Sequence, residues 1–148
     1  MPPVIRAARP GDHAAIAMLL RANDLPLDGV PPSGADFLVA EQDGGIVGVV
    51  GLERFGTHAL LRSAAVDAAV RGTGLGARLV AGVLDLAAQR GVEELWLLTT
   101  TAERWFPRFG FAVAARADVP PAVQASPEFQ GACPSTATVM RLAGTRRR

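Results

Sequence analysis

Three glycines at alternate positions, Gly72, Gly74 and Gly76, constrain the fold of this chain more than any other feature of its sequence. Residues 59–66 before them are mostly apolar, which predicts a strand, and the residues after them carry an apolar stripe at helical spacing as far as Arg90. A glycine loop between a strand and a helix exposes unpaired backbone N–H groups at the positive end of the helix dipole. Such a loop predicts a binding site for an anionic phosphate group.

The remaining sequence predicts a mixed α/β sheet. Turn formers at 43–45 predict an antiparallel hairpin, and the continuous apolar run at 94–99 is typical of a strand covered on both faces. Asp12 is expected to be the N-cap of the first helix. Residues 23–36 and 118–134 are rich in turn formers and are predicted to be loops. The predicted strands are residues 4–8, 37–41, 46–53, 59–66, 94–99, 111–115 and 137–142, and the predicted helices are 13–22, the segment from the glycine loop to 90, and 102–109.

Composition and charge exclude several classes of partner. The chain has 148 residues, 49% of them hydrophobic, so one domain with a substantial core is expected. Its 15 basic residues are all arginine and nearly balance 14 acidic residues, which argues against a surface that binds nucleic acid or anionic lipid. The basic run Arg146–Arg148 follows Gly144, so we predict a single domain over 1–143 and a disordered basic tail over 144–148.

The sequence also lacks the signals of export and metal binding. No stretch reaches the roughly 18 apolar residues that a membrane span needs, and the N-terminus has no apolar signal-peptide core. The expected location is therefore the cytoplasm, with no membrane partner. Cys133 is the one cysteine, and His13 and His58 are the two histidines, so neither a disulfide framework nor a metal site is expected.

Three kinds of phosphate site compete for the glycine loop. A Walker loop requires a lysine, and the chain contains none. A dinucleotide fingerprint requires Gly-x-Gly-x-x-Gly inside a parallel βαβ unit, whereas the glycines here alternate and the preceding strands are predicted to form an antiparallel meander. The third pattern, Arg/Gln-x-x-Gly-x-Gly/Ala, is matched by Arg71, Gly74 and Gly76. A glycine turn that only packs the helix on the strand is the structural alternative.

On that motif, and on the order of strands and helices around it, the chain resembles the GNAT superfamily of N-acetyltransferases. The resemblance implies an α/β (α+β) fold with a central twisted mixed sheet of six to seven strands flanked by about four helices. It also implies acetyl-CoA as the co-substrate, no metal, and a small-molecule amine acceptor that attacks the thioester directly. GNAT proteins are often dimers, so a homodimer is a further expectation.

The resemblance places the coenzyme site in two neighbouring segments. The strand before the glycine loop is expected to end in a bulge and to diverge from the next parallel strand, which leaves main-chain groups for the pantetheine arm. Those groups belong to Ala64, Ala65 and Val66. The pyrophosphate is expected to bind the arginine and the backbone amides of the loop and first helical turn, which comprise Arg71, Gly72, Thr73, Gly74, Leu75, Gly76 and Ala77.

Further stretches resemble the arsenic-resistance N-acetyltransferase branch of this superfamily. They are residues 51–53, 58–63, 98–102, 109–111, 128–129 and 133–135, with Met140. Parts of the same pattern are similar to the acetyltransferase domain of N-acetylglutamate synthases. The two resemblances imply that the acceptor is the primary amine of a small amino-acid-like molecule, and the first implies a role in arsenic resistance.

Two residues are candidates for the proton transfers. Glu53, near the end of a strand expected to reach the cleft, is the first candidate for the general base; an ion-paired structural glutamate is the alternative. Many GNAT enzymes carry a tyrosine as general acid four residues before a Gly-Phe pair, but that position is Phe106 and the chain has no tyrosine. Ser63, water or no dedicated acid remain. The missing tyrosine favours the alternative of a non-catalytic acyl-CoA-binding or sensor module.

Arg62 and Thr100 are the candidates for binding the acceptor. Arg62 shares a strand face with residues expected near the ligand, so its guanidinium could hold a carboxylate or an arsenic oxyanion in a bidentate pair. A salt bridge to an acid such as Glu53 is the alternative. Thr100 could contact the acetyl or pantetheine region, or cap the following turn. Cys133 is either a reactive thiol or a buried apolar residue. We expect the acceptor to enter beside the two predicted loops.

Overall fold

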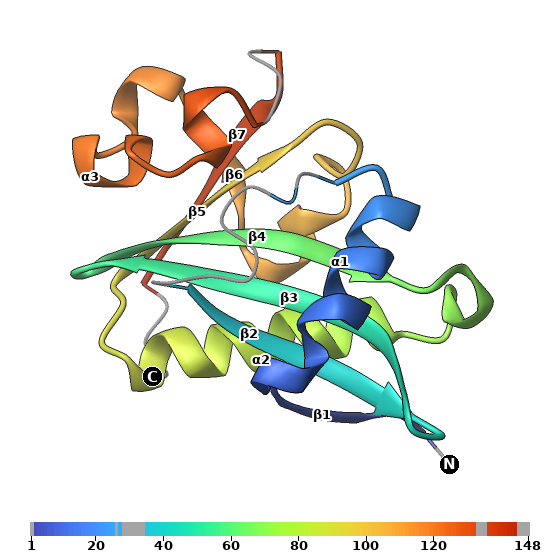
Figure 1. The fold of residues 1–148 in the computed structure, drawn as a ribbon. Coiled ribbons are helices and arrows are strands. Elements are labelled where there is room, and N and C mark those ends of the chain that lie inside the picture. The colour runs from blue at the N-terminus through green and yellow to red at the C-terminus, as the bar shows by residue number, and fades with distance from the viewer. Residues whose placement is uncertain (1, 26, 28–34, 133–135, 145–148) are drawn as a thin grey trace.

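The computed structural model describes residues 2–25, 27, 35–132 and 136–144. These residues form a seven-stranded mixed sheet with the strand order β1-β2-β3-β4-β5-β7-β6 (Figure 1). The predicted fold class is therefore confirmed. The strands are β1 Val4–Ala7, β2 Ala35–Gln42, β3 Gly45–Phe55, β4 His58–Val66, β5 Glu94–Thr99, β6 Ala112–Val113 and β7 Thr138–Ala143. The helices are α1 His13–Ala22, α2 Leu75–Gln89 and α3 Pro121–Gln124, and a π-helical turn spans Glu128–Ala132.

The two long helices cover opposite faces of the sheet (Figure 1). Because side chains alternate between faces along a strand, the neighbours Val39 and Ala40 of β2 point to opposite sides. Val39 packs in a cluster with Ile16 and Leu20 of α1, whereas Ala40 packs in the cluster that holds α2. The apolar stripe of α2 is buried as its spacing predicts, and it consists of Leu75, Leu79, Val80, Val83 and Ala87.

The junction between β4 and β5 positions the candidate site. These strands run parallel and pair over only three residues, where 58–60 lie against 94–96. The other neighbouring strands of the described sheet pair in antiparallel fashion. Because the paired stretch is at the start of both strands, β4 and β5 diverge toward their C-terminal ends and the sheet opens there.

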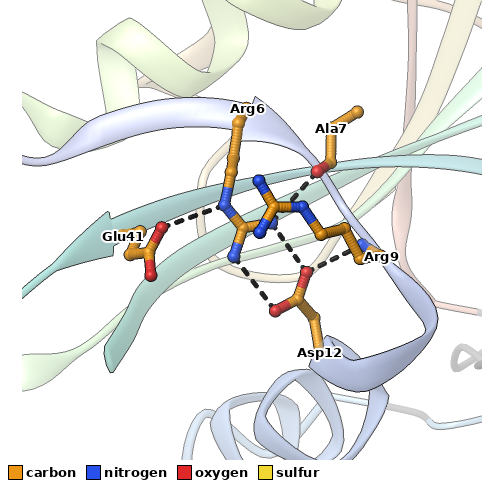
Figure 2. A network of polar contacts seen from close by, with 5 residues as sticks. All are labelled: Arg6, Ala7, Arg9, Asp12 and Glu41. Atoms are coloured by element: carbon orange, nitrogen blue, oxygen red, sulfur yellow. Dashed lines mark hydrogen bonds and ion pairs between the residues drawn. The ribbon is translucent and has the colours of Figure 1, made fainter. Parts of the chain in front are cut away.

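Arg6 joins the first strand to the start of α1 (Figure 2). Its guanidinium donates to the Asp12 carboxylate at 2.7 and 3.1 Å and to the Glu41 carboxylate at 3.0 Å. The Asp12 carboxylate also accepts the backbone N–H of Arg9 at 2.7 Å. Asp12 does occupy the N-cap position of α1, but its side chain makes no capping bond to that helix because it is bound to Arg6 and Arg9. The predicted helix boundary is confirmed and the predicted capping bond is wrong.

The Asp12 carboxylate gives the fold a pH-dependent contribution to stability. Hydrogen bonds from Arg6 and from the Arg9 N–H lower the pKa of Asp12 from 3.8 to about 2. The contribution is therefore fully present above pH 3.8 and is lost as the pH falls toward about 2, since the unfolded chain takes up this proton first. We expect Asp12→Asn to lower the free energy of unfolding at neutral pH, and the difference from wild type to shrink in urea titrations below about pH 4. A difference that is the same at neutral and acidic pH would contradict this.

Two predicted elements after β5 are shorter than expected. The predicted helix 102–109 is reduced to one 3₁₀ turn, Phe106–Phe109, because Pro107 lacks a backbone N–H and disfavours a helical conformation in the residue before it. The predicted strand 111–115 is reduced to β6 at the edge of the sheet, where it has one neighbour, β7.

The predicted loop 118–134 contains ordered helical structure. Both α3 and the π-helical turn lie within it. Val123 of α3 is fully buried and packs in a cluster with Trp96, so burial of an apolar side chain, rather than a long hydrophobic period, stabilises this segment. Within the described ranges, no helix is long and apolar enough to cross a membrane.

Some predictions lie partly or wholly outside the described residues. β2 begins two residues earlier than predicted, at Ala35, so the predicted loop 23–36 is shorter than expected. Residues 26 and 28–34 of that loop lie outside the described residues. Cys133 and residues 145–148 of the predicted tail 144–148 are outside them as well.

Candidate functional site

The divergence of β4 and β5 opens a cavity of about 450 Å³ between the two strands. Residues 61–66 of β4 form one wall and residues 97–102 form the opposite wall. The rest of the lining comprises the first turns of α2, residues 23–25 after α1, Val49, Trp105, Phe106, Glu128 and Ala137. A volume of this size is within the range of small-molecule sites.

A β-bulge in β4 shapes the first wall. The register between β3 and β4 shifts by one residue between Val49 and Gly51, at the level of Ser63 and Ala64. Ser63 has a φ of +57°, a left-handed conformation that is uncommon for a residue with a side chain. The extra residue of a bulge lies outside the ladder, which suits main-chain contact with a ligand. The bulge and the diverging strands that the GNAT resemblance implies are both present.

The glycine loop lies at the Val66 end of this wall. Gly72 and Gly74 have φ angles of +81° and +85°, and Gly74 is the N-cap of α2. These left-handed angles suit glycine, and they turn the chain abruptly into the helix. The first backbone N–H groups of α2 are thereby presented at the end of the cavity, with the geometry of an anion site.

Arg71 extends from the loop to the turn after α1. Its Nη2 donates to Asn23 Oδ1 at 2.5 Å, and its Nε donates to the Val66 carbonyl at 3.4 Å. Since Asn23 and Val66 both line the cavity, the exposed guanidinium of Arg71 lies at the mouth. Thr73 stabilises the loop from within, because its hydroxyl donates to the Val70 carbonyl at 2.6 Å.

Arg62, on β4, is a buried cation toward the other end of the wall. Its side chain is 1% exposed, its Nη1 lies 3.4 Å from Glu53 Oε1 on β3, and its Nη2 lies 3.8 Å from Glu128 Oε2. Its Nε donates to Ser63 Oγ at 3.2 Å. The ion pair between Arg62 and Glu53, which the sequence offered as an alternative to ligand binding, is thus present.

Ser126 attaches the π-helical turn to β3. Its hydroxyl donates to Glu53 Oε1 at 2.6 Å and accepts the backbone N–H of Glu128 at 3.2 Å. Ser126 and Glu128 are both buried, with 1% and 6% of their surfaces exposed. These contacts place the Glu128 carboxylate on the cavity wall beside Arg62.

The structure brings most of the predicted site residues to this cavity. Glu53 is the exception among the predicted catalytic groups, because it is not part of the lining, although its carboxylate contacts Arg62 and Ser126. The predicted residues on the wall are Arg62, Ser63, Ala64, Ala65, Val66, Gly76 and Thr100. The adjoining loop and first helical turn hold Arg71, Gly72, Thr73, Gly74, Leu75 and Ala77.

Glu128 and Asn23 are polar wall residues to which the sequence analysis assigns no role. Glu128 follows a proline-containing stretch with no hydrophobic period, so no local pattern places it beside β4. One sequence feature could have identified Asn23 as a site residue. It is a polar residue directly after a predicted helix, at the start of a long loop, where functional side chains are frequent.

The second wall holds the position of the missing tyrosine. Phe106 is buried there and packs edge-on against Trp105 and Phe111, with ring centroids 5.0 and 5.6 Å apart. Its ring offers no hydroxyl to a ligand. Thr99 Oγ1 accepts the backbone N–H of Ala102 at 2.9 Å and so caps the turn after β5. Among the described residues, no group of three or more histidine, cysteine or acidic side chains is placed to hold a metal ion.

Comparison with known protein sequences finds amino-acid acetyltransferases. The acetyltransferase (GNAT) domain family matches residues 33–113. An amino-acid acetyltransferase of Neisseria meningitidis serogroup A is 31% identical over 130 residues, which cover 78% of this chain and 29% of that protein. One of Ralstonia nicotianae is 36% identical over 88 residues, which cover 58% of this chain and 20% of that protein. This chain therefore spans less than a third of the length of these curated relatives.

Solved structures show the same architecture. The N-acetylglutamate synthase of Neisseria gonorrhoeae, complexed with coenzyme A and N-acetyl-glutamate, has a TM-score of 0.81 at 25% identity over 99% of this chain and 35% of that one. Rv2747 of Mycobacterium tuberculosis, in complex with CoA and NLQ, has a TM-score of 0.76 at 23% identity over 95% and 99% of the two chains, which shows a shared fold. Since the family match covers more than half of its residues, the chain belongs to the acetyltransferase (GNAT) domain family.

Proposed function

We propose that this protein transfers the acetyl group of acetyl-CoA to the primary amine of a small amino-acid-like molecule by direct attack. The observation that carries the proposal is a single cavity whose wall runs from the glycine loop to the buried Arg62 cluster. Such a cavity can hold a phosphate-bearing coenzyme at one end and a charged acceptor at the other, with the reacting atoms between them. The likeness to amino-acid acetyltransferases supports an amino acid as the acceptor.

The coenzyme is proposed to lie along the β4 wall. Arg71 and the first N–H groups of α2 are the proposed contacts of its pyrophosphate, because they combine a cation with an anion-binding helix start. Ala64, Ala65 and Val66, which follow the bulge, are the proposed main-chain contacts of the pantetheine arm. This direction brings the thioester to the level of Ser63.

Ser63 is the proposed proton donor for the departing thiolate. Its Oγ accepts the N–H of Arg62, and a hydroxyl that accepts in this way keeps its own hydrogen to donate. A thiolate is already a tolerable leaving group near neutral pH. A serine hydroxyl can therefore replace the tyrosine hydroxyl that is absent here because the position is occupied by Phe106. Water is the remaining candidate for the same step.

The acceptor is proposed to bind at the Arg62 end, with Thr100 on the opposite wall. Glu53, the general base predicted from sequence, belongs to the same cluster through its ion pair with Arg62. The arsenic-resistance resemblance adds one specific class of acceptor, an arsenic-containing amine. Its support is the set of sequence stretches described above, whereas the named relatives support an ordinary amino acid.

A non-catalytic acyl-CoA-binding module is the second candidate function. The observation that favours it is the buried phenyl ring of Phe106 at the position of the usual general acid. Such a module would keep the coenzyme half of the cavity and need no base.

Calorimetric titration with acetyl-CoA, combined with an assay of coenzyme A release, tests these alternatives. We expect binding on the order of micromolar and release that depends on adding at least one amine from a panel of amino acids and arsenic-containing amines. Binding without release would support the non-catalytic module. Absence of binding would overturn both proposals.

A further inference from the structure

Glu128 is a buried carboxylate on the wall of the cavity. We propose that Glu128 binds the ammonium group of the acceptor and takes a proton from it, and that Glu53 is a positioning residue that fixes Arg62 and Ser126. This inference rests on the function proposed above and identifies which of the two carboxylates touches the substrate.

The first argument is access. Glu128 lines the cavity together with Arg62 and Ser63. Glu53 is not part of the lining; 16% of its side chain is exposed, and one of its oxygens, Oε1, meets both the Ser126 hydroxyl at 2.6 Å and Arg62 Nη1 at 3.4 Å. Asp24 is the other acid on the described wall, but it is exposed and adjoins Asn23, the partner of Arg71 at the mouth. Glu128 is therefore the wall carboxylate at the acceptor end.

The second argument is the distance to the expected thioester. One guanidinium contacts both groups: Arg62 Nε donates to Ser63 Oγ at 3.2 Å, and Arg62 Nη2 lies 3.8 Å from Glu128 Oε2. A proton acceptor and a proton donor that share one guanidinium are close enough to act on one small substrate. An amine held by Glu128 is thus next to the bulge where the thioester is proposed to lie.

The third argument is charge. Glu128 is a buried acid on the described wall. A nearby cation stabilises a buried carboxylate, because water solvates the charge poorly there. The ammonium group of an acceptor supplies a cation to Glu128, whereas an acceptor carboxylate in the same place would be repelled. We therefore expect the acceptor to present its amine, and not its carboxylate, to Glu128.

The proposed step balances as follows in protons and electrons. The ammonium group gives one proton to the Glu128 carboxylate and becomes a neutral amine. The amine nitrogen attacks the thioester carbon, so that a C–N bond forms and the C–S bond breaks with its electron pair on sulfur. A second proton leaves the nitrogen and reaches the thiolate through the Ser63 hydroxyl. Glu128 then returns its proton to solvent, and the products are the N-acetyl amine, free coenzyme A and one proton.

Glu128→Gln and Glu53→Gln separate the two roles, because each removes one charge at nearly constant size. With acetyl-CoA and an accepted amine, we expect Glu128→Gln to lower kcat/KM about 100-fold or more at neutral pH. The residual rate should rise with pH in proportion to the unprotonated fraction of the acceptor amine, without the plateau that a general base gives the wild-type profile. Glu53→Gln should lower kcat/KM less than about tenfold, keep the wild-type shape of the pH profile, and lower the midpoint of unfolding. Glu93→Gln, at an exposed acid before β5, is the matched control.

Two further measurements keep the outcomes distinct. Glu128→Asp should recover part of the activity that Glu128→Gln loses, and both variants should bind acetyl-CoA with wild-type affinity, which excludes misfolding as the cause. Equal losses in Glu53→Gln and Glu128→Gln, or a pH profile of Glu128→Gln with the same shape as that of wild type, would overturn the assignment. A wild-type protein that binds acetyl-CoA but acetylates no amine would instead overturn the proposed function, and this role with it.

Discussion

Gly74→Ala is expected to weaken the affinity for acetyl-CoA about 100-fold, which corresponds to about 2.7 kcal/mol. Gly74 has a φ of +85° at the N-cap of α2. An alanine in this left-handed conformation costs roughly 1–2 kcal/mol, and relief of that strain turns the first N–H groups of α2 away from a bound phosphate. A methyl group also occupies space into which the coenzyme must come close to the backbone. Calorimetric titration with acetyl-CoA measures the change.

Gly91→Ala is the matched control for this variant. Gly91 has a φ of +76° just beyond the other end of α2, and an added Cβ would meet nothing within 4 Å, as is true of Gly74. The two substitutions should therefore introduce similar backbone strain and similar losses in the free energy of unfolding. Only Gly74→Ala should affect coenzyme affinity. If Gly91→Ala weakened it equally, general destabilisation would be the cause and the loop would have no special role.

Arg62→Met is expected to lower the free energy of unfolding by about 3–5 kcal/mol. Methionine replaces much of the volume of the arginine stem, so the main change is the loss of the positive charge. Glu53 and Glu128 are then left close together in the protein without the guanidinium that lies 3.4 and 3.8 Å from them. Urea denaturation followed by circular dichroism measures the change in the free energy of unfolding.

Arg141→Met tests whether burial causes the large effect. Arg141 also pairs with a glutamate, with its Nη2 2.6 Å from Glu94 Oε2, but 47% of its side chain is exposed. Solvent screens such a pair, so the expected loss is below about 1 kcal/mol. Similar losses for Arg62→Met and Arg141→Met would show that burial of the Arg62 side chain does not cause the large effect.

Local patterns in the sequence predict much of this fold. The strand at 94–99 and the helix at 13–22 have the predicted bounds, because the apolar run and the helical period that define them are complete within each segment. The glycine loop could be predicted as an anion site for the same reason, because the strand, the glycines and the helix that form the motif are contiguous in the chain.

What the sequence could not predict depends on contacts between different elements of the fold and not on the pattern within one element. Asp12 has the expected position at a helix start, but Arg6 on the adjoining strand takes its carboxylate. Glu128 and Ser126 meet Arg62 and Glu53 only because α3 and the following turn fold back onto the sheet, and one buried valine is the main apolar anchor of α3. A single apolar residue is too weak a signal to place a segment in advance.

The bond between Ser126 and Glu53 ties a late segment of the chain to the middle of the sheet. It joins residues 73 positions apart, whereas the glycine loop, its strand and its helix are contiguous. A segment held by few long-range contacts can open locally while the rest of the domain stays folded. Under the function proposed above, opening of the segment that carries Ser126 and Glu128 would leave a protein that holds acetyl-CoA but has nowhere to receive an amine. Docking of this segment would then determine whether the domain can act as an enzyme.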